Sequence, residues 1–184
     1  MTCFKWYLII LKQMPIFRTY QLIVPPVKLT NTQQAHKKSE NCDTNQDIGL
    51  SRGGRNTKIH AVVDAIGNPI HLFLTPGNVN DCIVAVDVLK GVELAGSIVM
   101  GDKAYGTTEI RGYIEAHNAT FCIPPKTNAA NPWDCDFHQY KERHVVECFF
   151  NLIKQFRRVA TRYEKLSKNF LSFALLASSM VLLR

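Results

Sequence analysis

A phenol, a carboxylate, an amide and three cations recur at helical spacing in a strongly apolar segment: Tyr140, Arg143, Glu147, Asn151, Lys154 and Arg158. An α-helix turns by about 100° per residue, so all six fall within a stripe roughly 80° wide. Such a stripe is either the solvated face of an ordinary amphipathic helix or a face presented to a reacting group. Arg143 and Glu147 have ion-pair spacing in both interpretations, so periodicity leaves the choice open.

A second carboxylate, Asp102, directly follows a short apolar run at residues 97–100 that predicts a strand covered on both faces. Reactive side chains of open α/β sheets gather at the carboxyl ends of strands. A carboxylate in that position is costly to bury unless it meets a cation. The alternative is an ordinary turn or helix-capping aspartate.

Local patterns predict the elements that would position these side chains. Residues 57–74 alternate around the turn Gly67-Asn68-Pro69, which predicts a β-hairpin, and His60 then projects away from the apolar face as a surface or second-layer residue. A helical pattern covers residues 83–89. The strand at 97–100, a helix capped at Thr107 or Thr108, and a strand around 120–123 predict a parallel pair with a right-handed crossover.

The hairpin and the crossover together predict an α/β mixed sheet with helices packed on it. Residues 126–139 read as a loop, in which the lone Trp133 is better explained as a packing anchor than as a base-stacking residue. A long helix from Tyr140 onward and a last helix at 167–183 complete the predicted core. The last helix is too short to cross a bilayer and is expected to be a buried core helix.

Composition indicates one globular domain with a basic surface. The chain has 184 residues, and 22 Lys and Arg against 15 Asp and Glu give a formal net charge of +7. Such a surface favours nucleic acid over a membrane as the partner, although an RNA-binding or protein-binding domain would share the charge. The six cysteines have no zinc-ligand spacing, which indicates a reduced cytosolic chain.

The order of these features resembles the DDE transposases of bacterial insertion sequences, family five within the family-four group. The resemblance rests on "GDKAYG" around Asp102, followed by the Y-x2-R-x3-E-x6-K pattern of Tyr140, Arg143, Glu147 and Lys154. "SRGGRNTKIHAVVDAIGNPIHLFLTPGNVND" and "QFRRVATRYEKL" are also similar to that family. The resemblance therefore covers about residues 48–184, which would form the partial catalytic core.

The resemblance implies a ribonuclease-H-like mixed sheet flanked by helices, with three carboxylates that hold two divalent ions, Mg²⁺ or Mn²⁺. By this carry-over Asp102 and Glu147 are metal ligands and catalytic residues. The implied DNA-binding residues are Tyr140, Arg143, Lys154 and Arg158. The implied partners are insertion-sequence ends and target DNA in the bacterial cytoplasm, at the nucleoid. A homodimer is left open, and no membrane is expected.

One part of the family pattern is missing. The family carries its first catalytic Asp in an Asp-Ser-Thr triplet on an opening strand. The corresponding region here reads "PPVKLTNTQQAHKKSE", where Leu29, Thr30 and Asn31 supply no carboxylate. We therefore expect residues 1–47 to be irregular or degenerate and the sheet to lack its N-terminal strand. The expected function is metal-dependent DNA cleavage and strand transfer, inactive in this chain alone. The alternative is a non-catalytic DNA-binding remnant that modulates intact transposase.

Overall fold

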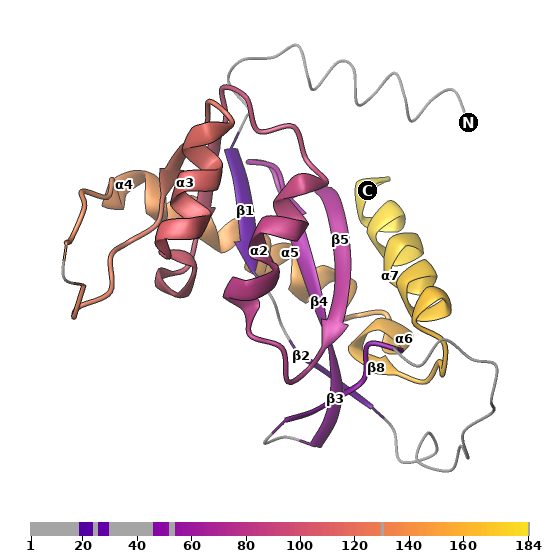
Figure 1. Ribbon diagram of the computed structural model, residues 1–184. Helices are drawn as coiled ribbons and strands as arrows, with labels where there is room; N and C mark the ends of the chain where they lie inside the picture. The colour runs from indigo at the N-terminus through magenta and orange to yellow at the C-terminus, as the bar shows by residue number, and fades with distance from the viewer. Residues whose placement is uncertain (1–18, 24–25, 30–45, 52–53, 130, 184) are drawn as a thin grey trace.

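A mixed β-sheet forms the centre of the chain in the computed structural model, which describes residues 19–23, 26–29, 46–51, 54–129 and 131–183 (Figure 1). Five strands lie side by side in the order β7 (Thr120–Cys122), β6 (Ile98–Gly101), β1 (Thr19–Ile23), β4 (Gly54–Val63) and β5 (Pro69–Pro76). β7, β6 and β1 are parallel to one another, and β4 is antiparallel to β1 and to β5. The predicted hairpin and the predicted parallel pair are both confirmed.

Three shorter strands extend the sheet around β4. β2 (Pro26–Leu29) continues the line of β1 along β4 in one register, with Ile23 opposite Ala61 and Pro26 opposite Lys58. β8 (Thr161–Arg162) is parallel to β2, and β3 (Gly49–Ser51) pairs with the start of β4. β1 and β2 come from the region expected to be irregular, so the expected gap at the N-terminal strand is corrected. β1 lies between two other strands and carries no alternating pattern that would reveal it.

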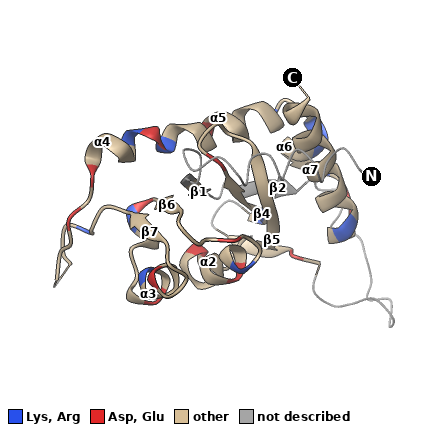
Figure 2. Ribbon diagram, turned by 90° about the horizontal axis from the view of Figure 1, so that it is seen from above, with Lys and Arg blue, Asp and Glu red and all other residues tan. Residues whose placement is uncertain are grey.

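Helices cover both faces of the sheet (Figure 2). α2 (Asp81–Lys90) and α3 (Thr108–Ala116) pack on one face, where Val62, Val88 and Ile114 belong to one buried cluster. α5 (His144–Ile153), α6 (Arg157–Ala160) and α7 (Ser167–Leu182) pack on the other face. The α/β class predicted from the sequence is confirmed in this layered form.

The predicted long helix is broken in two places. It is divided into α4 (Phe137–Tyr140), the 3-10 turn η4 (Lys141–Arg143) and α5, and a turn at 154–156 then separates α5 from α6. The second break lets the chain reach β8, where Arg162 donates a hydrogen bond to Thr57 on β4. Tertiary contacts therefore override the local helical pattern. As a result, Arg158 does not share a helix with Glu147.

The last helix is only partly a core helix. α7 buries Phe170, Ala174 and Ala177 against the sheet and α5, but Leu176 and Met180 are exposed. The helix covers one side of β5 at the border of the molecule, so it has a partner on one face only. None of the helices within the described ranges is long and apolar enough to span a membrane.

His60 is buried, with 1% of its surface exposed, so of the two positions predicted for it, surface or second layer, the surface position is excluded. Because helices cover both faces of the sheet, the consecutive residues 59–63 of β4 are all buried, whichever face they point to. His60 Nε2 lies 2.7 Å from the Thr75 hydroxyl, and its other ring nitrogen has no hydrogen-bond partner within the described part of the chain. Burial, opposed by Asp81 and aided by Lys58, lowers the pKa of His60 to about 4.

This lowered pKa predicts a loss of stability on acidification. The unfolded chain takes up a proton at His60 near its ordinary pKa of about 6.5, whereas the folded chain resists protonation until about pH 4. The stabilisation is complete above pH 6.5 and is lost as the pH falls toward 4, by about 3 kcal/mol. Urea unfolding of the parent and of His60→Gln at several pH values measures it. Equal pH dependence in the two proteins would contradict the assignment.

Arg162 is a fully buried cation, and each of its three guanidinium nitrogens donates a hydrogen bond to a neutral oxygen. Its guanidinium donates to Thr57 Oγ1 at 2.6 Å, to the Glu164 carbonyl at 2.9 Å and to the Lys165 carbonyl at 3.0 Å. Burial lowers its pKa, although Asp47 and Glu164 oppose the shift. The residue therefore ties β8 and the segment before α7 to β4.

Replacing this cation is expected to destabilise the fold. Arg162→Met leaves three acceptors without their donor, each worth about 1 kcal/mol, so the free energy of unfolding should fall by about 3 kcal/mol. Arg157→Met is the matched control, because Arg157 is exposed on α6, and it should change stability by less than about 0.5 kcal/mol. Chemical denaturation compares the two variants. A similar small effect for both would show that the Arg162 contacts contribute little.

Candidate active site

Asp102 lies where β6 ends and the 3-10 turn η3 (Lys103–Tyr105) begins. The strand in front of it is buried, with Val99 at 2% and Met100 at 1% exposure, and this fixes the position of the Asp102 backbone. Its side chain accepts a hydrogen bond from the Lys103 amide at 3.1 Å and keeps half of its surface exposed. The carboxylate is therefore both a turn cap and an accessible group at the carboxyl end of a strand.

The helical segment that follows residue 136 brings Tyr140 to Asp102. Asp136 caps α4 by accepting hydrogen bonds from the amides of His138 and Gln139 at 2.9 and 3.1 Å. From the end of α4, the Tyr140 hydroxyl donates to Asp102 Oδ1 at 3.2 Å. Burial raises the pKa of Tyr140, so the hydroxyl keeps the proton that it donates.

Arg143 connects the two carboxylates expected to carry the chemistry. Its Nη1 lies 3.7 Å from Asp102 Oδ2, and its Nη2 lies 3.2 Å from Glu147 Oε1. Glu147 is half exposed on α5, whereas Arg143 is only 24% exposed, and its guanidinium lies 5.4 Å from the centre of the Tyr140 ring. Two residues 45 positions apart along the chain, Asp102 and Glu147, are thus neighbours of one cation.

The register of β1 identifies a third position beside this group. β1 runs parallel to β6, with Leu22 paired to Gly101. Ile23 is the next residue of β1 after this pair, and Asp102 is the next residue after β6, so the same register continued by one step would set their backbones side by side. The backbone position that adjoins Asp102 is therefore residue 23, earlier in the chain than the Leu29 to Asn31 segment considered from the sequence.

Two of the expected DNA-binding residues lie farther along the chain. Lys154 is exposed at the end of α5, and no ion pair holds it among the described residues. Arg158 belongs to α6, where it forms an ion pair of 2.5 Å with Glu164 and lies over the Phe173 ring. The structure thus brings Tyr140 and Arg143 to Asp102 and joins Glu147 to them through Arg143, but it does not join Arg158 to this group.

Other polar residues near these elements have structural roles. Asp64 is buried and accepts hydrogen bonds from the backbone of Ile66 and from Asn68, which closes the turn between β4 and β5. Trp133 donates to the Ile123 carbonyl at 2.7 Å and stacks against Arg111 at 3.8 Å, so its expected packing role is confirmed.

The described residues do not fit a two-ion site. Nowhere in that part of the chain do three or more His, Cys, Asp or Glu side chains gather where they could hold a metal ion. Asp102 and Glu147 have the oxygen chemistry that Mg²⁺ or Mn²⁺ prefers, but a guanidinium connects them. The third position, residue 23, carries an aliphatic side chain.

Comparison with known proteins places the chain in a family. The family described as "Transposase DDE domain" matches residues 26–182, so the chain belongs to this family of DDE transposases. A protein of Brucella ovis named "Putative transposase for insertion sequence element IS6501" is 41% identical over 129 residues. The aligned part covers 70% of this chain and 98% of that relative.

Solved structures with a similar arrangement include two complexes of Mos1 transposase. A pre-cleavage Mos1 transpososome matches with a TM-score of 0.40 and 10% identity over 96% of this chain. A Mos1 mariner paired-end complex with Mn matches with a TM-score of 0.38 and 13% identity over 88% of this chain. The chain spans 60% and 56% of those two Mos1 chains.

Sequence reasoning missed one position of this site and placed another in the wrong helix. Ile23 could have been found only from the pairing of β1 with β6, which no local pattern contains. The separation of Arg158 follows from the turn at 154–156, for which the apolar pattern gives no warning. The local signals were sufficient to predict that Tyr140, Arg143 and Glu147 share a face, and the contacts of Tyr140 and Arg143 with Asp102 bring that face to the end of β6, while the roles of these residues stay a prediction.

Proposed function

We propose that this chain is a transposase core that binds insertion-sequence DNA through Tyr140, Arg143 and Lys154 and does not cleave DNA on its own. The observation that carries the proposal is the position of Arg143 between Asp102 and Glu147, close to both. A cation there suits a phosphodiester strand, and it also balances two carboxylates that would otherwise repel DNA.

Each side chain has a distinct part in this proposal. Arg143 presents a planar fork that can hold two oxygens of one phosphate, and Lys154 adds a point charge at the other end of α5. Tyr140 holds the Asp102 carboxylate through its hydroxyl, which keeps that group aligned beside the bound strand. Asp102 and Glu147 then lie next to the phosphodiester on which the chemistry would occur.

The chemistry that these carboxylates would serve is cleavage of a phosphodiester and joining of the strand to a target. Mg²⁺ or Mn²⁺ would supply the Lewis acid for both steps in a complete site. The described residues provide two of the carboxylates and, at residue 23, an isoleucine in place of another. We therefore assign no step to a metal ion in this chain, and we do not expect cleavage.

The isoleucine favours a second candidate, a DNA-binding remnant that modulates an intact transposase. Both candidates bind DNA, and they differ in whether the chain alone breaks a strand. Supercoiled plasmid incubated with Mg²⁺ or Mn²⁺ should remain uncut by the chain, while fluorescence anisotropy shows binding to a duplex oligonucleotide. Nicking that is lost in Glu147→Gln, with binding retained, would show an active enzyme. Absence of DNA binding would refute both candidates.

A further inference from the structure

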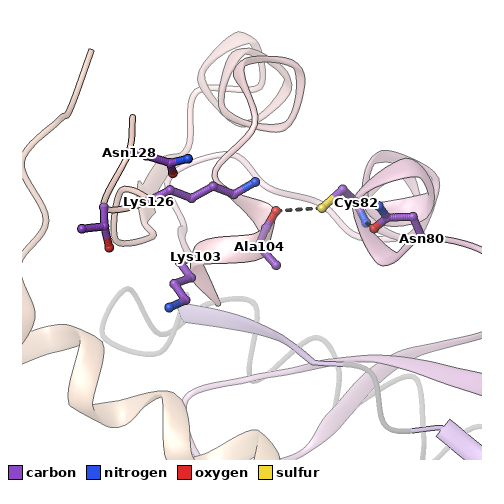
Figure 3. Close-up of a pocket in the computed structure, with 7 residues that line it drawn as sticks. Asn80, Cys82, Lys103, Ala104, Lys126 and Asn128 are labelled. Carbon is purple, nitrogen blue, oxygen red and sulfur yellow. Dashed lines mark hydrogen bonds between the residues drawn. The ribbon is translucent and has the colours of Figure 1, made fainter. Parts of the chain in front are cut away.

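A pocket of about 400 Å³ is lined in part by Lys103 and Ala104, the two residues that follow Asp102, and none of Tyr140, Arg143 and Glu147 lines it (Figure 3). Three segments line it, namely the start of α2, the turn η3 and the loop after β7. The lining residues are Asn80, Cys82, Lys103, Ala104, Lys126, Thr127 and Asn128. Its size is within the range of small-ligand sites, roughly 300 to 1,000 Å³, and is sufficient for one nucleotide.

The lining of this pocket favours an anion with hydrogen-bonding groups. It has two lysines, two asparagines and a threonine, and none of its lining residues is acidic. Figure 3 shows Lys126 extended along the pocket toward Ala104 and Cys82, with Asn128 beside it, while Lys103 projects from the other side of Ala104. Ammonium groups supply charge for a phosphate, and amides and a hydroxyl supply donors and acceptors for the rest of a nucleotide.

The charge of the two lysines is available to a ligand. Within the described residues, no ion pair engages Lys103 or Lys126, whereas Lys58 and Lys90 are each paired with an aspartate. The two carboxylates nearest in sequence to the lining residues are already compensated. Asp81 lies 2.8 Å from Lys58, and Asp102 pairs with Arg143. The net charge of the side chains around the pocket is therefore positive.

Lys103 connects the pocket with the side chains proposed to bind DNA. Lys103 follows Asp102 directly, and the Asp102 carboxylate accepts from the Lys103 amide. A strand held by Arg143 with one phosphate near Asp102 would therefore have its neighbouring nucleotide within reach of Lys103, which lines the pocket.

We propose that this pocket binds the phosphate of one nucleotide in the DNA strand that lies across Asp102, through Lys103 and Lys126. The proposal rests on the proposed DNA binding, and it adds a contact region to which α5 contributes no residue. A free nucleotide has the same chemistry, so the experiment separates the two sources.

Cys82 is a natural reporter for occupancy of the pocket. Its thiol is free, partly exposed, and donates to the Ala104 carbonyl at 2.7 Å. Alkylation by iodoacetamide, followed peptide by peptide with mass spectrometry, measures its accessibility. With duplex DNA at ten times its Kd, mass action leaves about one pocket in ten free, so labelling of Cys82 should slow about tenfold.

Variants and a second ligand make the result specific. In the double variant Lys103→Ala, Lys126→Ala, Cys82 should be labelled at nearly the rate of the free protein, even with saturating DNA bound through α5. Lys168→Ala is the control, because this exposed lysine belongs to α7, which packs on the other face of the sheet from α2, and it should leave the protection unchanged. Deoxyadenosine monophosphate, added alone, should protect Cys82 only at much higher concentrations than DNA does.

Anisotropy measured on the same samples separates failure of the pocket from failure of DNA binding. DNA that is bound while Cys82 reacts at its free rate would overturn the pocket proposal and leave the proposed function intact. Protection that persists in the double lysine variant would also overturn it. If no DNA binds, the proposed function fails, and protection by the mononucleotide alone would show a nucleotide site that DNA does not use.

Discussion

Ile23→Asp should convert the chain into a divalent-metal-binding protein and restore metal-dependent nicking of supercoiled DNA. The register of β1 against β6 places residue 23 beside Asp102, and Asp102 shares Arg143 with Glu147. A third carboxylate at this point would raise the negative charge around one cation and favour Mg²⁺ or Mn²⁺ as additional counter-charge. We expect Mn²⁺ affinity to rise at least about tenfold, because charge count sets the affinity of oxygen-ligand sites.

Titration calorimetry or electron paramagnetic resonance of Mn²⁺ gives the first readout, independent of activity. Ile23→Asn is the matched control, since it introduces a polar side chain of the same size without the charge, and it should bind no more Mn²⁺ than the parent. Adding Glu147→Gln to Ile23→Asp should reverse the gain. A folded Ile23→Asp protein, shown by its thermal unfolding, that binds Mn²⁺ no better than Ile23→Asn would mean that residue 23 is not the missing position.

The sequence predicts those helices and strands whose hydrophobic pattern and flanking turns lie within one short segment of the chain. The hairpin of β4 and β5 was readable because one turn separates two alternating runs, and β6, α3 and β7 were readable because an apolar run, a cap and a second run follow in order. β1 was not readable, because its pairing with β4 and β6 joins segments that are far apart in the sequence. His60 was predicted to be a surface or second-layer residue, because alternation indicates two faces and does not reveal that helices cover both.

The candidate site also has parts that local patterns predict and parts that they do not. Helical spacing is a local property, and it predicts that Tyr140, Arg143 and Glu147 share a face, of which Tyr140 and Arg143 contact Asp102. Ile23 joins them through strand register, and the pocket joins three loops, and both depend on contacts between distant segments. Arg162 illustrates the limit most clearly, since an arginine in a basic stretch is expected in solvent, and here it is completely buried.

Arg143→Ala is expected to weaken binding to unrelated DNA sequences by about tenfold, because it removes a charge-assisted contact worth about 1.5 kcal/mol. The slope of the logarithm of the binding constant against the logarithm of the salt concentration should become shallower by about 0.9, because each phosphate contact releases about one counterion. Lys154→Ala should give a smaller loss of the same kind, because an exposed ammonium binds as a point charge. Lys90→Ala, on the opposite face of the sheet, should leave both quantities unchanged.

A second explanation must be separated from phosphate binding. Arg143 also neutralises Glu147 at 3.2 Å, so its removal exposes a carboxylate that repels DNA. A double-mutant cycle with Glu147→Gln distinguishes the two effects. If Arg143 contacts phosphate, Arg143→Ala should weaken binding about equally in the parent and in the Glu147→Gln background, and the salt slope should fall in both. If the loss disappears in the Glu147→Gln background, Arg143 acts only by balancing that carboxylate, and α5 does not hold the strand through this side chain.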